Sequence, residues 1–351
     1  MTLVPTSVPD LNTTVLYGYQ NETNVTQCPE HGWDWLTASQ PVYILILTVL
    51  GVVLNVFVLM VFCLNKKPCT VAEIYLSNLA AADLLLLSCL PFWAINLAND
   101  FNWPFGLFMC KVVNLGIQMN VYSSIYFLVL VSIDRYLALV HPLSHGRMRR
   151  PKYAKLGCLL IWSFGLIMGV PTIVFRKLKY FPEYDVNACY LDYPNYTVEM
   201  LCDRMLIIFS FVVPISIISF CTFKIIQTLR VQSVERFSAE KTEQKATTLI
   251  LAVLLAFLIC WVPFHLLTVL DLLQREEVLG GCHFSNVLDI LHQISSYLAF
   301  FNSVLNPILY VIVGKNFRKK AGEVFKQWNI KRRATMESTS SHLSCTLKTV
   351  K

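Results

Sequence analysis

Apolar positions gather into seven long runs that short polar segments separate. By residue number the runs cover about 41–64, 71–98, 107–133, 154–175, 201–229, 247–273 and 286–313. A helix needs roughly 20 apolar residues to cross the ~30 Å hydrocarbon core of a bilayer, and every run meets that length. Five internal prolines do not exclude membrane helices, because neighbouring helices can satisfy the backbone groups that a proline leaves without a hydrogen bond. They are Pro91, Pro171, Pro214, Pro263 and Pro307. The pattern predicts an all-α membrane protein, a seven-transmembrane helix bundle.

The third run differs from a helix that faces only lipid. Residues 112–133 carry no charge, so at about 1.5 Å per residue they span a bilayer. Small or polar side chains nevertheless recur in it, namely Asn114, Gly116, Gln118, Asn120, Ser123 and Ser124. Such residues mark contacts between helices. We therefore expect this helix to be surrounded by the others.

The flanking segments complete the domain organisation. Residues 1–40 are polar and hold glycosylation sequons at Asn12, Asn21 and Asn24, which predicts an extracellular tail before the 41–313 bundle. In 314–329 basic and apolar residues alternate at helical spacing, which is typical of an amphipathic helix on the membrane surface. Residues 330–351 are polar and are expected to form a disordered cytoplasmic tail that kinases can modify. The candidate sites are Thr335, Ser338, Thr339, Ser340, Ser341 and Ser344.

Composition and charge agree with this arrangement. The chain is 55% hydrophobic and 15% charged, below the ~25% charged residues of a soluble domain. Its net charge of +7 does not indicate nucleic-acid binding, because most of the basic residues fall on the segments expected inside the cell. The positive-inside rule then predicts an extracellular N-terminus and a cytoplasmic C-terminus, and the plasma membrane is the expected location. Acidic residues favour the outer side, where they would attract a cationic ligand.

Short motifs fall on these spans in order. They are Gly51 with Asn55, Leu79-Ala80-Ala81-Ala82-Asp83, Asp134-Arg135-Tyr136, Trp162, Pro214, Phe257 with Cys260-Trp261-Val262-Pro263-Phe264, and Asn306-Pro307-Ile308-Leu309-Tyr310. With them the chain resembles the rhodopsin-like G-protein-coupled receptors. Four segments, 70–76, 91–95, 131–140 and 310–315, are similar more narrowly to the bradykinin (kinin) receptors. Thr222 departs from the family pattern, which often has a tyrosine there.

The resemblance implies a signalling apparatus. The residues that match it are Asp134, Arg135, Tyr136, Trp261, Pro263, Asn306, Pro307 and Tyr310. Asp134 and Arg135 would neutralise each other in the resting receptor, and the arginine would face the G protein in the active one. Family members also hold a sodium ion next to the acid that matches Asp83. The corresponding residues here are Asp83, Asn120, Ser124 and Asn302. Apart from this ion, no cofactor is expected.

Outer cysteines give two expected disulfides. The family joins the cysteines that match Cys110 and Cys189, which are both on the oxidising side. Cys28 and Cys282 form a second outer pair, and Cys202 is expected to stay free.

The ligand site is expected at the outer half of the bundle. The candidates are Asp271, Asp289, Gln118, Glu199, Trp93, Ile117, Trp261, Phe264 and Gln293. In kinin receptors the acids matching Asp271 and Asp289 engage the cationic end of the peptide, and two carboxylates suit a guanidinium. The subtype that prefers peptides without their C-terminal arginine has a lysine where this chain has Gln118. The resemblance is therefore to the subtype that prefers intact kinins.

The sequence gives less support to other functions. No lysine lies in 286–313 to hold retinal, and Ile117 stands where an amine receptor has an aspartate. A transporter would show a path of intramembrane charges, whereas only Asp83 is expected to be deeply buried. An angiotensin-like or chemokine-like peptide receptor remains an alternative. The resemblance implies a kinin ligand with terminal arginines, a G protein of the Gq/11 or Gi type, phospholipase C, calcium release, arrestin, receptor kinases and no enzymatic activity.

Overall fold

The computed structural model describes residues 34–65, 68–141, 150–232, 241–275, 282–312, 314, 317–330 and 332. It has seven helical spans long and apolar enough to cross a membrane. Their helices are α2 (Asp34–Leu64), α3 (Val71–Ala98), α4 (Gly106–Val140), α6 (Pro151–Met168) with α7 (Val170–Phe175), α8 (Tyr196–Ile207) with α9 (Val213–Gln232), α10 (Lys241–Arg275) and α11 (Cys282–Ile312). The predicted seven-helix bundle is confirmed.

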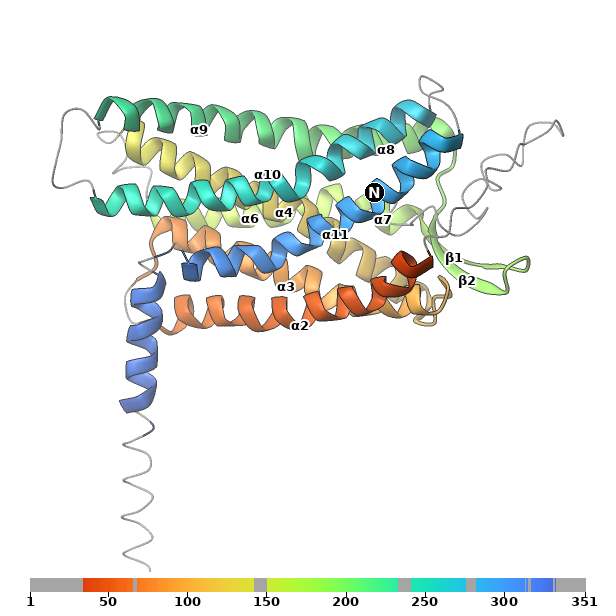
Figure 1. Ribbon diagram of the computed structural model, residues 1–351, viewed down its shortest axis with the longest axis horizontal. Coiled ribbons are helices and arrows are strands. Elements are labelled where there is room, and N and C mark those ends of the chain that lie inside the picture. Colours follow the sequence, from red (N-terminus) through yellow and green to blue (C-terminus); the bar gives the residue numbers. More distant parts are fainter. Residues whose placement is uncertain are drawn as a thin grey trace, which may run out of the picture.

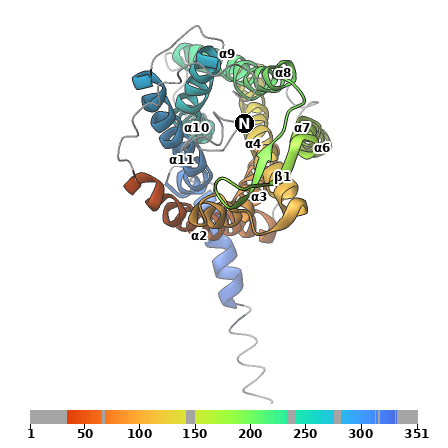
Figure 2. The ribbon, with the colours of Figure 1, turned by 90° about the vertical axis from the view of Figure 1, so that its right-hand side faces the viewer.

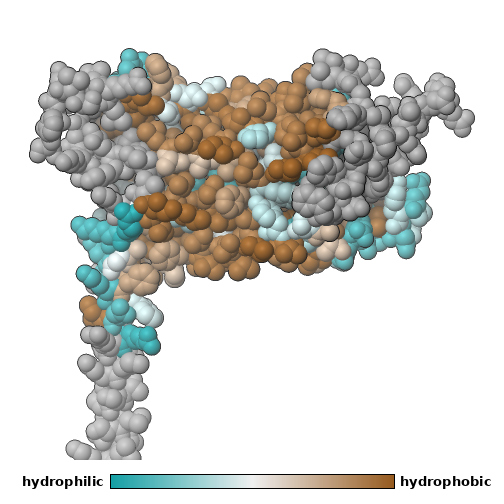
Figure 3. Space-filling view, in the orientation of Figure 1, coloured by the Kyte–Doolittle hydropathy of each residue, from teal (hydrophilic) through white to brown (hydrophobic). Residues whose placement is uncertain are grey.

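The helices stand side by side and form a closed ring in the end view (Figure 2). Spans α3, α4 and α11 have 56% of their most apolar window buried, against 22% for the span made of α6 and α7. This agrees with the central position expected for the third span from its polar residues. The outer surface of the bundle is largely apolar, as the brown band in Figure 3 shows. Such a surface suits contact with lipid.

Two spans depart from regular α-helix near a proline. The fourth span breaks at Gly169, two residues before Pro171, so that it forms α6 and α7 instead of one helix. In the fifth span a π-helical turn, η1 (Ile208–Val212), lies between α8 and α9, just before Pro214. Proline lacks the N–H that continues an α-helical hydrogen-bond ladder, and an inserted π turn is one way to accommodate that loss. Both predicted spans, 154–175 and 201–229, are nevertheless present as membrane-length segments.

A β-hairpin, which the hydrophobic pattern did not predict, lies at one end of the bundle (Figure 1). Strands β1 (Arg176–Phe181) and β2 (Val186–Leu191) pair antiparallel, and Leu178 is opposite Cys189. The Trp103 N–H donates to Asn187 O at 2.8 Å, which joins the hairpin to the loop between α3 and α4. The strands are short and lie outside the membrane spans, so they add nothing to the pattern of long apolar runs.

A further helix, residues 317–330, follows α11 at the other end of the bundle and runs at a steep angle to it (Figure 1). Its Phe317 is buried against Phe57 and Phe62, with ring centroids 5.8 and 5.5 Å apart. Phe325 and Trp328 are exposed. The amphipathic helix expected over 314–329 is therefore present, with one side on the bundle and apolar side chains left for a membrane surface.

Candidate functional site

The two ends of the bundle are called outer and inner after the orientation that the charge pattern predicts. The outer end, where the hairpin lies, is held by a covalent bond. Cys110 of α4 and Cys189 of β2 form a disulfide with Cα atoms 5.8 Å apart, as expected. Arg176 is buried beside it and donates from Nη1 to Cys189 O at 3.0 Å. This burial lowers the pKa of Arg176 to about 10, because desolvation disfavours the charged guanidinium. Cys202 is free, while Cys28 and the side chain of Cys282 lie outside the described residues.

A column of stacked rings runs through α10. Trp261 stacks on Phe257 below it and on His265 above it, each with centroids 5.8 Å apart. His265 also stacks on Phe211 of η1, with centroids 4.7 Å apart. His265 is 1% exposed, and among the described residues neither ring nitrogen has a hydrogen-bond partner. Buried polar atoms without partners are uncommon, so this imidazole is suited to meet a ligand or a water.

Sequence reasoning did not select His265 as a site residue, because a single histidine near the outer side carried no motif. The available signal was its spacing. His265 follows Trp261 by four residues, so both lie on one face of α10.

The aromatic and aliphatic ligand candidates lie in two core clusters. Trp93 and Ile117 belong to the cluster that includes Trp103 and Cys110, at the outer end of α3 and α4. Trp261 and Phe264 belong to the other cluster and contact each other with centroids 6.0 Å apart. Their role in ligand binding stays a prediction. Three buried donors among the candidates have no partner in the described part of the chain. They are Trp93 Nε1, Trp261 Nε1 and Gln293 Nε2.

The outer acids Asp271 and Asp289 lie on neighbouring helices at one level. Thr268 Oγ1 of α10 and His292 Nε2 of α11 are 3.2 Å apart. Asp271 follows Thr268 by three residues, and Asp289 precedes His292 by three, on helices that run in opposite directions. Each acid is therefore about one turn further out than this contact. The geometry is compatible with a shared cationic partner for the two carboxylates.

Two further candidates come from other helices. Glu199 lies in the first turn of α8, whose N-cap Asn195 accepts a hydrogen bond from the Val198 N–H at 2.9 Å. Gln118 on α4 is half-buried and lies one helical turn before Tyr122. Asn195 also begins the triplet Asn-Tyr-Thr, a further glycosylation sequon that lies outside the N-terminal tail. The tail sequons at Asn12, Asn21 and Asn24 lie outside the described residues.

Asp83 is the centre of a buried polar network in the middle of the bundle. Its Oδ2 accepts from Asn306 Nδ2 at 3.1 Å and its Oδ1 from Asn120 Nδ2 at 3.5 Å. Three side-chain oxygens at or within one helical turn of Asn120 and Asn306 are buried and have no hydrogen-bond partner among the described residues. They are Ser124 Oγ, Asn302 Oδ1 and Asn306 Oδ1. A carboxylate with spare oxygen ligands fits a hard cation, because such ions prefer carboxylate and carbonyl oxygen.

At the inner end Arg135 Nη2 and Asp134 Oδ2 are 3.0 Å apart, as expected for a neutralised pair. Both residues are buried, at 8% and 7% exposure, and so is Asp203 of α8 at 9%. The expectation that only Asp83 is a deeply buried charge was therefore wrong. Pairing explains the difference for Asp134 and Arg135, because neighbouring opposite charges offset the cost of burial.

The remaining signalling candidates connect the inner ends of several helices. The Tyr136 hydroxyl and His141 Nε2 are 3.0 Å apart, and the Tyr136 ring contacts Phe220 of α9 at 5.7 Å. Tyr310 is buried on α11, and its ring lies 6.2 Å from Phe317 in the surface helix. Pro263 and Pro307 lie inside α10 and α11. The candidate phosphorylation sites lie outside the described residues.

Comparison with known proteins identifies the family. The profile of the 7 transmembrane receptor (rhodopsin family) matches residues 54–310. The chain is 49% identical to the human B2 bradykinin receptor over 304 residues, which cover 86% of this chain and 78% of that receptor. It is 52% identical to the rat B2 bradykinin receptor over 85% of this chain and 76% of that receptor.

The B1 bradykinin receptor is less similar. The human protein is 39% identical to this chain, with 91% of each chain covered. The protein is thus a multi-pass membrane receptor and not an enzyme. The chain belongs to the rhodopsin family of seven-transmembrane receptors and, within it, to the bradykinin receptors, with greater similarity to the B2 subtype.

Proposed function

We propose that this chain is a receptor for kinin peptides that signals through a heterotrimeric G protein. The main support is that about half of its aligned residues are identical to those of receptors named for bradykinin. The N-terminus faces outward, and the peptide enters at the end of the bundle where the disulfide and the hairpin lie. Kinins added to cells that express the chain should raise cytosolic calcium. A transporter would carry labelled peptide into these cells, and we expect no such uptake.

The proposed signal passes to Gq/11 and phospholipase C, with Gi as a second G protein. Receptor kinases and arrestin act on the C-terminal tail. Blocking Gq/11 selectively should abolish the calcium response, and any remaining fall in cyclic AMP would reveal Gi. A calcium response that survives the Gq/11 block would contradict this route.

The cationic end of the peptide binds between Asp271 and Asp289. Their common level on α10 and α11 supports this, and a guanidinium donates to two carboxylates in a fixed geometry. Replacing both with Asn should cost at least ~2 kcal/mol in kinin affinity, as for other close charge pairs. Surface expression measured in parallel separates lost binding from lost folding. A defect confined to expression would reject the assignment.

Gln118 sets the preference for an intact C-terminal arginine. Because Gln118 is neutral, it does not offset the negative charge of Asp271 and Asp289. A lysine at this position would repel a guanidinium. Intact kinin should be at least about tenfold more potent than arginine-trimmed kinin, which corresponds to ~1.4 kcal/mol. Gln118→Lys should shrink or reverse that ratio, while Asn114→Lys tests whether any added charge does the same. Equal potency of both peptides on the parent would defeat the idea.

Asp83, Asn120, Ser124 and Asn302 are proposed to hold a sodium ion that favours the inactive receptor. The support is the buried carboxylate with spare oxygens on Ser124 and Asn302. Sodium should raise the melting temperature of the purified receptor and weaken agonist binding. Both effects should disappear in Asp83→Asn. If either sodium effect persists in that variant, sodium does not bind at this network.

A further inference from the structure

The contact between Thr268 of α10 and His292 of α11 determines which ring nitrogen of the histidine carries a hydrogen. Thr268 Oγ1 lies 2.9 Å from Phe264 O and 3.2 Å from His292 Nε2. A backbone carbonyl can only accept, so the single hydroxyl proton of Thr268 goes to Phe264 O. The hydroxyl oxygen then accepts at the other contact, and His292 Nε2–H donates to it. In the neutral ring Nδ1 is therefore the nitrogen that can take up a proton.

The position of His292 does not depend on its charge. Its ring contacts the ring of Phe264, with centroids 5.0 Å apart. Its backbone carbonyl accepts from the hydroxyls of Ser295 and Ser296, each at 2.8 Å. A proton added at Nδ1 leaves the Nε2–H donor in place, so the hydrogen bond to Thr268 survives. Protonation of His292 therefore adds a positive charge without loosening α10 from α11.

This charge would arise one turn inward from the two outer acids. Asp289 precedes His292 by three residues, and side chains at that spacing are neighbours on a helix surface, with Cβ atoms about 5–6 Å apart. Asp271 follows Thr268 by three residues, so it is also about one turn further out. The three titratable side chains are half-buried, where charges interact more strongly than in bulk water. A protonated His292 thus offsets part of the negative charge available to a cationic ligand.

Histidine is the side chain whose charge ordinarily changes between about pH 5 and 8. A second histidine, His265, lies one turn inward from Thr268 on α10 and is enclosed by aromatic rings. The other titratable or charged residues with described side chains in the outer part of α11 and of the helices packed on α10 and α11 include Tyr43 on α2, Tyr297 on α11, Lys111 on α4, and Glu199, Asp203 and Arg204 on α8. Tyrosine, lysine, arginine and carboxylate side chains ordinarily keep their charge in this pH range. The two histidines are therefore the groups to separate by experiment.

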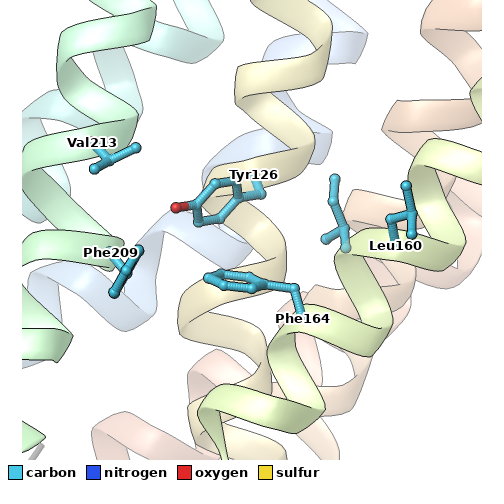
Figure 4. A pocket seen from close by; sticks show the side chains of 6 residues that line it. Tyr126, Leu160, Phe164, Phe209 and Val213 are labelled. Carbon is cyan, nitrogen blue, oxygen red and sulfur yellow. The ribbon is translucent and has the colours of Figure 1, made fainter.

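The pocket between α4, α6 and η1 offers no comparable place for a cation (Figure 4). Its six lining residues are aromatic or aliphatic, among them Tyr126, Phe164 and Phe209, and none is acidic. A ligand held there would not respond to the charge of His292. A pH effect on ligand affinity therefore distinguishes binding at the outer acids from binding at this pocket.

We propose that His292 makes the ligand site sensitive to acid, because its imidazolium competes with the cationic end of the ligand for Asp271 and Asp289. While the imidazole is uncharged, both carboxylates are available to a guanidinium. Once it takes up a proton, it offsets their charge, so ligand affinity falls as the pH falls. By linkage, a bound guanidinium opposes the protonation of His292 to the same extent. The inference rests on the proposed binding of a kinin at these two acids.

The first test measures equilibrium binding of labelled kinin to the full chain in phosphatidylcholine nanodiscs at about pH 7.5 and about pH 5.5, on either side of the ordinary histidine range. The parent should lose at least about threefold in affinity at the lower pH. His292→Gln keeps an N–H donor for Thr268 but takes up no charge, so most of this loss should disappear. His265→Gln is the matched control and should keep the pH dependence of the parent.

Three outcomes of this test would overturn the assignment to His292. They are a parent affinity that does not fall with pH, a pH dependence that persists in His292→Gln, and one that disappears in His265→Gln.

The second test needs no ligand and separates this inference from the proposed function. In NMR spectra of the receptor with ¹⁵N-labelled histidine, the His292 signals are those lost in His292→Gln. They should show the Nε2–H tautomer and should change with pH over the same range. Asp271→Asn with Asp289→Asn should leave His292 less protonated at about pH 6, because the carboxylates that favour its charge are gone.

The two tests fail in different ways. If kinin binds at neither pH, the proposed function is wrong, and the NMR titration still decides whether His292 responds to the outer acids. If the His292 signals do not respond to pH or to the loss of the two acids, the inference itself is overturned, even where kinin binds well.

Discussion

The two ends of the bundle are held by different kinds of interaction. At the outer end the Cys110–Cys189 disulfide joins α4 to the hairpin. At the inner end an ion pair joins Lys320 of the surface helix to Glu73 of α3, and Arg135 pairs with its neighbour Asp134 within α4. A covalent bond does not open on the timescale of a signal, whereas an ion pair exchanges one partner for another at modest cost. The contrast suggests an outer end built to keep its shape and an inner end built to rearrange.

The carboxylate of Glu73 takes part in two contacts at the inner end. Its Oε2 accepts from the Thr70 N–H at 2.8 Å, which caps the start of α3, and from Lys320 Nζ, also at 2.8 Å. In addition Asn65 Nδ2 donates to Glu323 Oε2 at 3.4 Å. One carboxylate thus links the first turn of α3 to the surface helix. A shift of that helix would be transmitted directly to α3.

Removal of the outer disulfide should have the largest effect. Cys110→Ser together with Cys189→Ser should destabilise the receptor by about 2–5 kcal/mol and abolish kinin binding at the cell surface. Thermal unfolding of the purified protein and surface binding of labelled peptide measure the two effects. Cys202→Ser is the control, because this cysteine is free and half-buried. If the double variant melts like the Cys202 control, the outer end does not depend on its covalent tie.

Arg135→Ala should separate binding from signalling. The substitution removes the partner of Asp134 at the inner end and leaves the outer contacts untouched. Kinin affinity should stay within about threefold of the parent, which is less than ~0.7 kcal/mol, while the calcium response is lost. Arg150→Ala, at the exposed N-cap of α6, should preserve both. A calcium response that survives Arg135→Ala would show that this arginine does not transmit the signal.

How far the sequence predicts this molecule depends on the length scale of each feature. The seven spans follow from runs of apolar residues, and Asp83 with Arg135 follows from charges that stand out in such runs. The hairpin and the π turn were missed because they depend on a few backbone hydrogen bonds that leave no trace in hydropathy. His265 was missed for a related reason, since its burial against Phe211 requires η1 to turn that ring inward.

Lys320→Ala should have an intermediate effect on stability. The side chains of Lys320 and Glu73 are 13% and 12% exposed, so their contact is shielded from water. Its loss should cost about 1.5–3 kcal/mol, the range for hydrogen bonds to charged groups. Thermal unfolding of the purified receptor measures this, and Lys319→Ala, at the exposed neighbouring position, is the control. If the two variants have equal melting temperatures, the Lys320–Glu73 ion pair does not stabilise the inner end.

Lys177→Ala in the hairpin should have the smallest effect, although its ion pair is shorter. Lys177 Nζ and Asp192 Oδ2 are 2.6 Å apart, but the side chains are 56% and 39% exposed. The hydrogen bond and the charge of Asp192 raise the pKa of Lys177 above its usual value. The contribution to stability is therefore fully present at neutral pH and is lost only as the pH rises through the raised pKa. Water and salt screen an exposed pair, so its contribution is small even where it is complete.

The melting temperature of Lys177→Ala at neutral pH and physiological salt should therefore match that of the parent within error. Lowering the salt should reveal a small difference, and raising the pH well above the ordinary lysine range should remove it again. Lys320→Ala, measured alongside, should stay destabilised at every salt concentration, because its pair is shielded. If Lys177→Ala lowers the melting temperature as much as Lys320→Ala does, the outer end relies on ionic ties as well, and the distinction between the two ends fails.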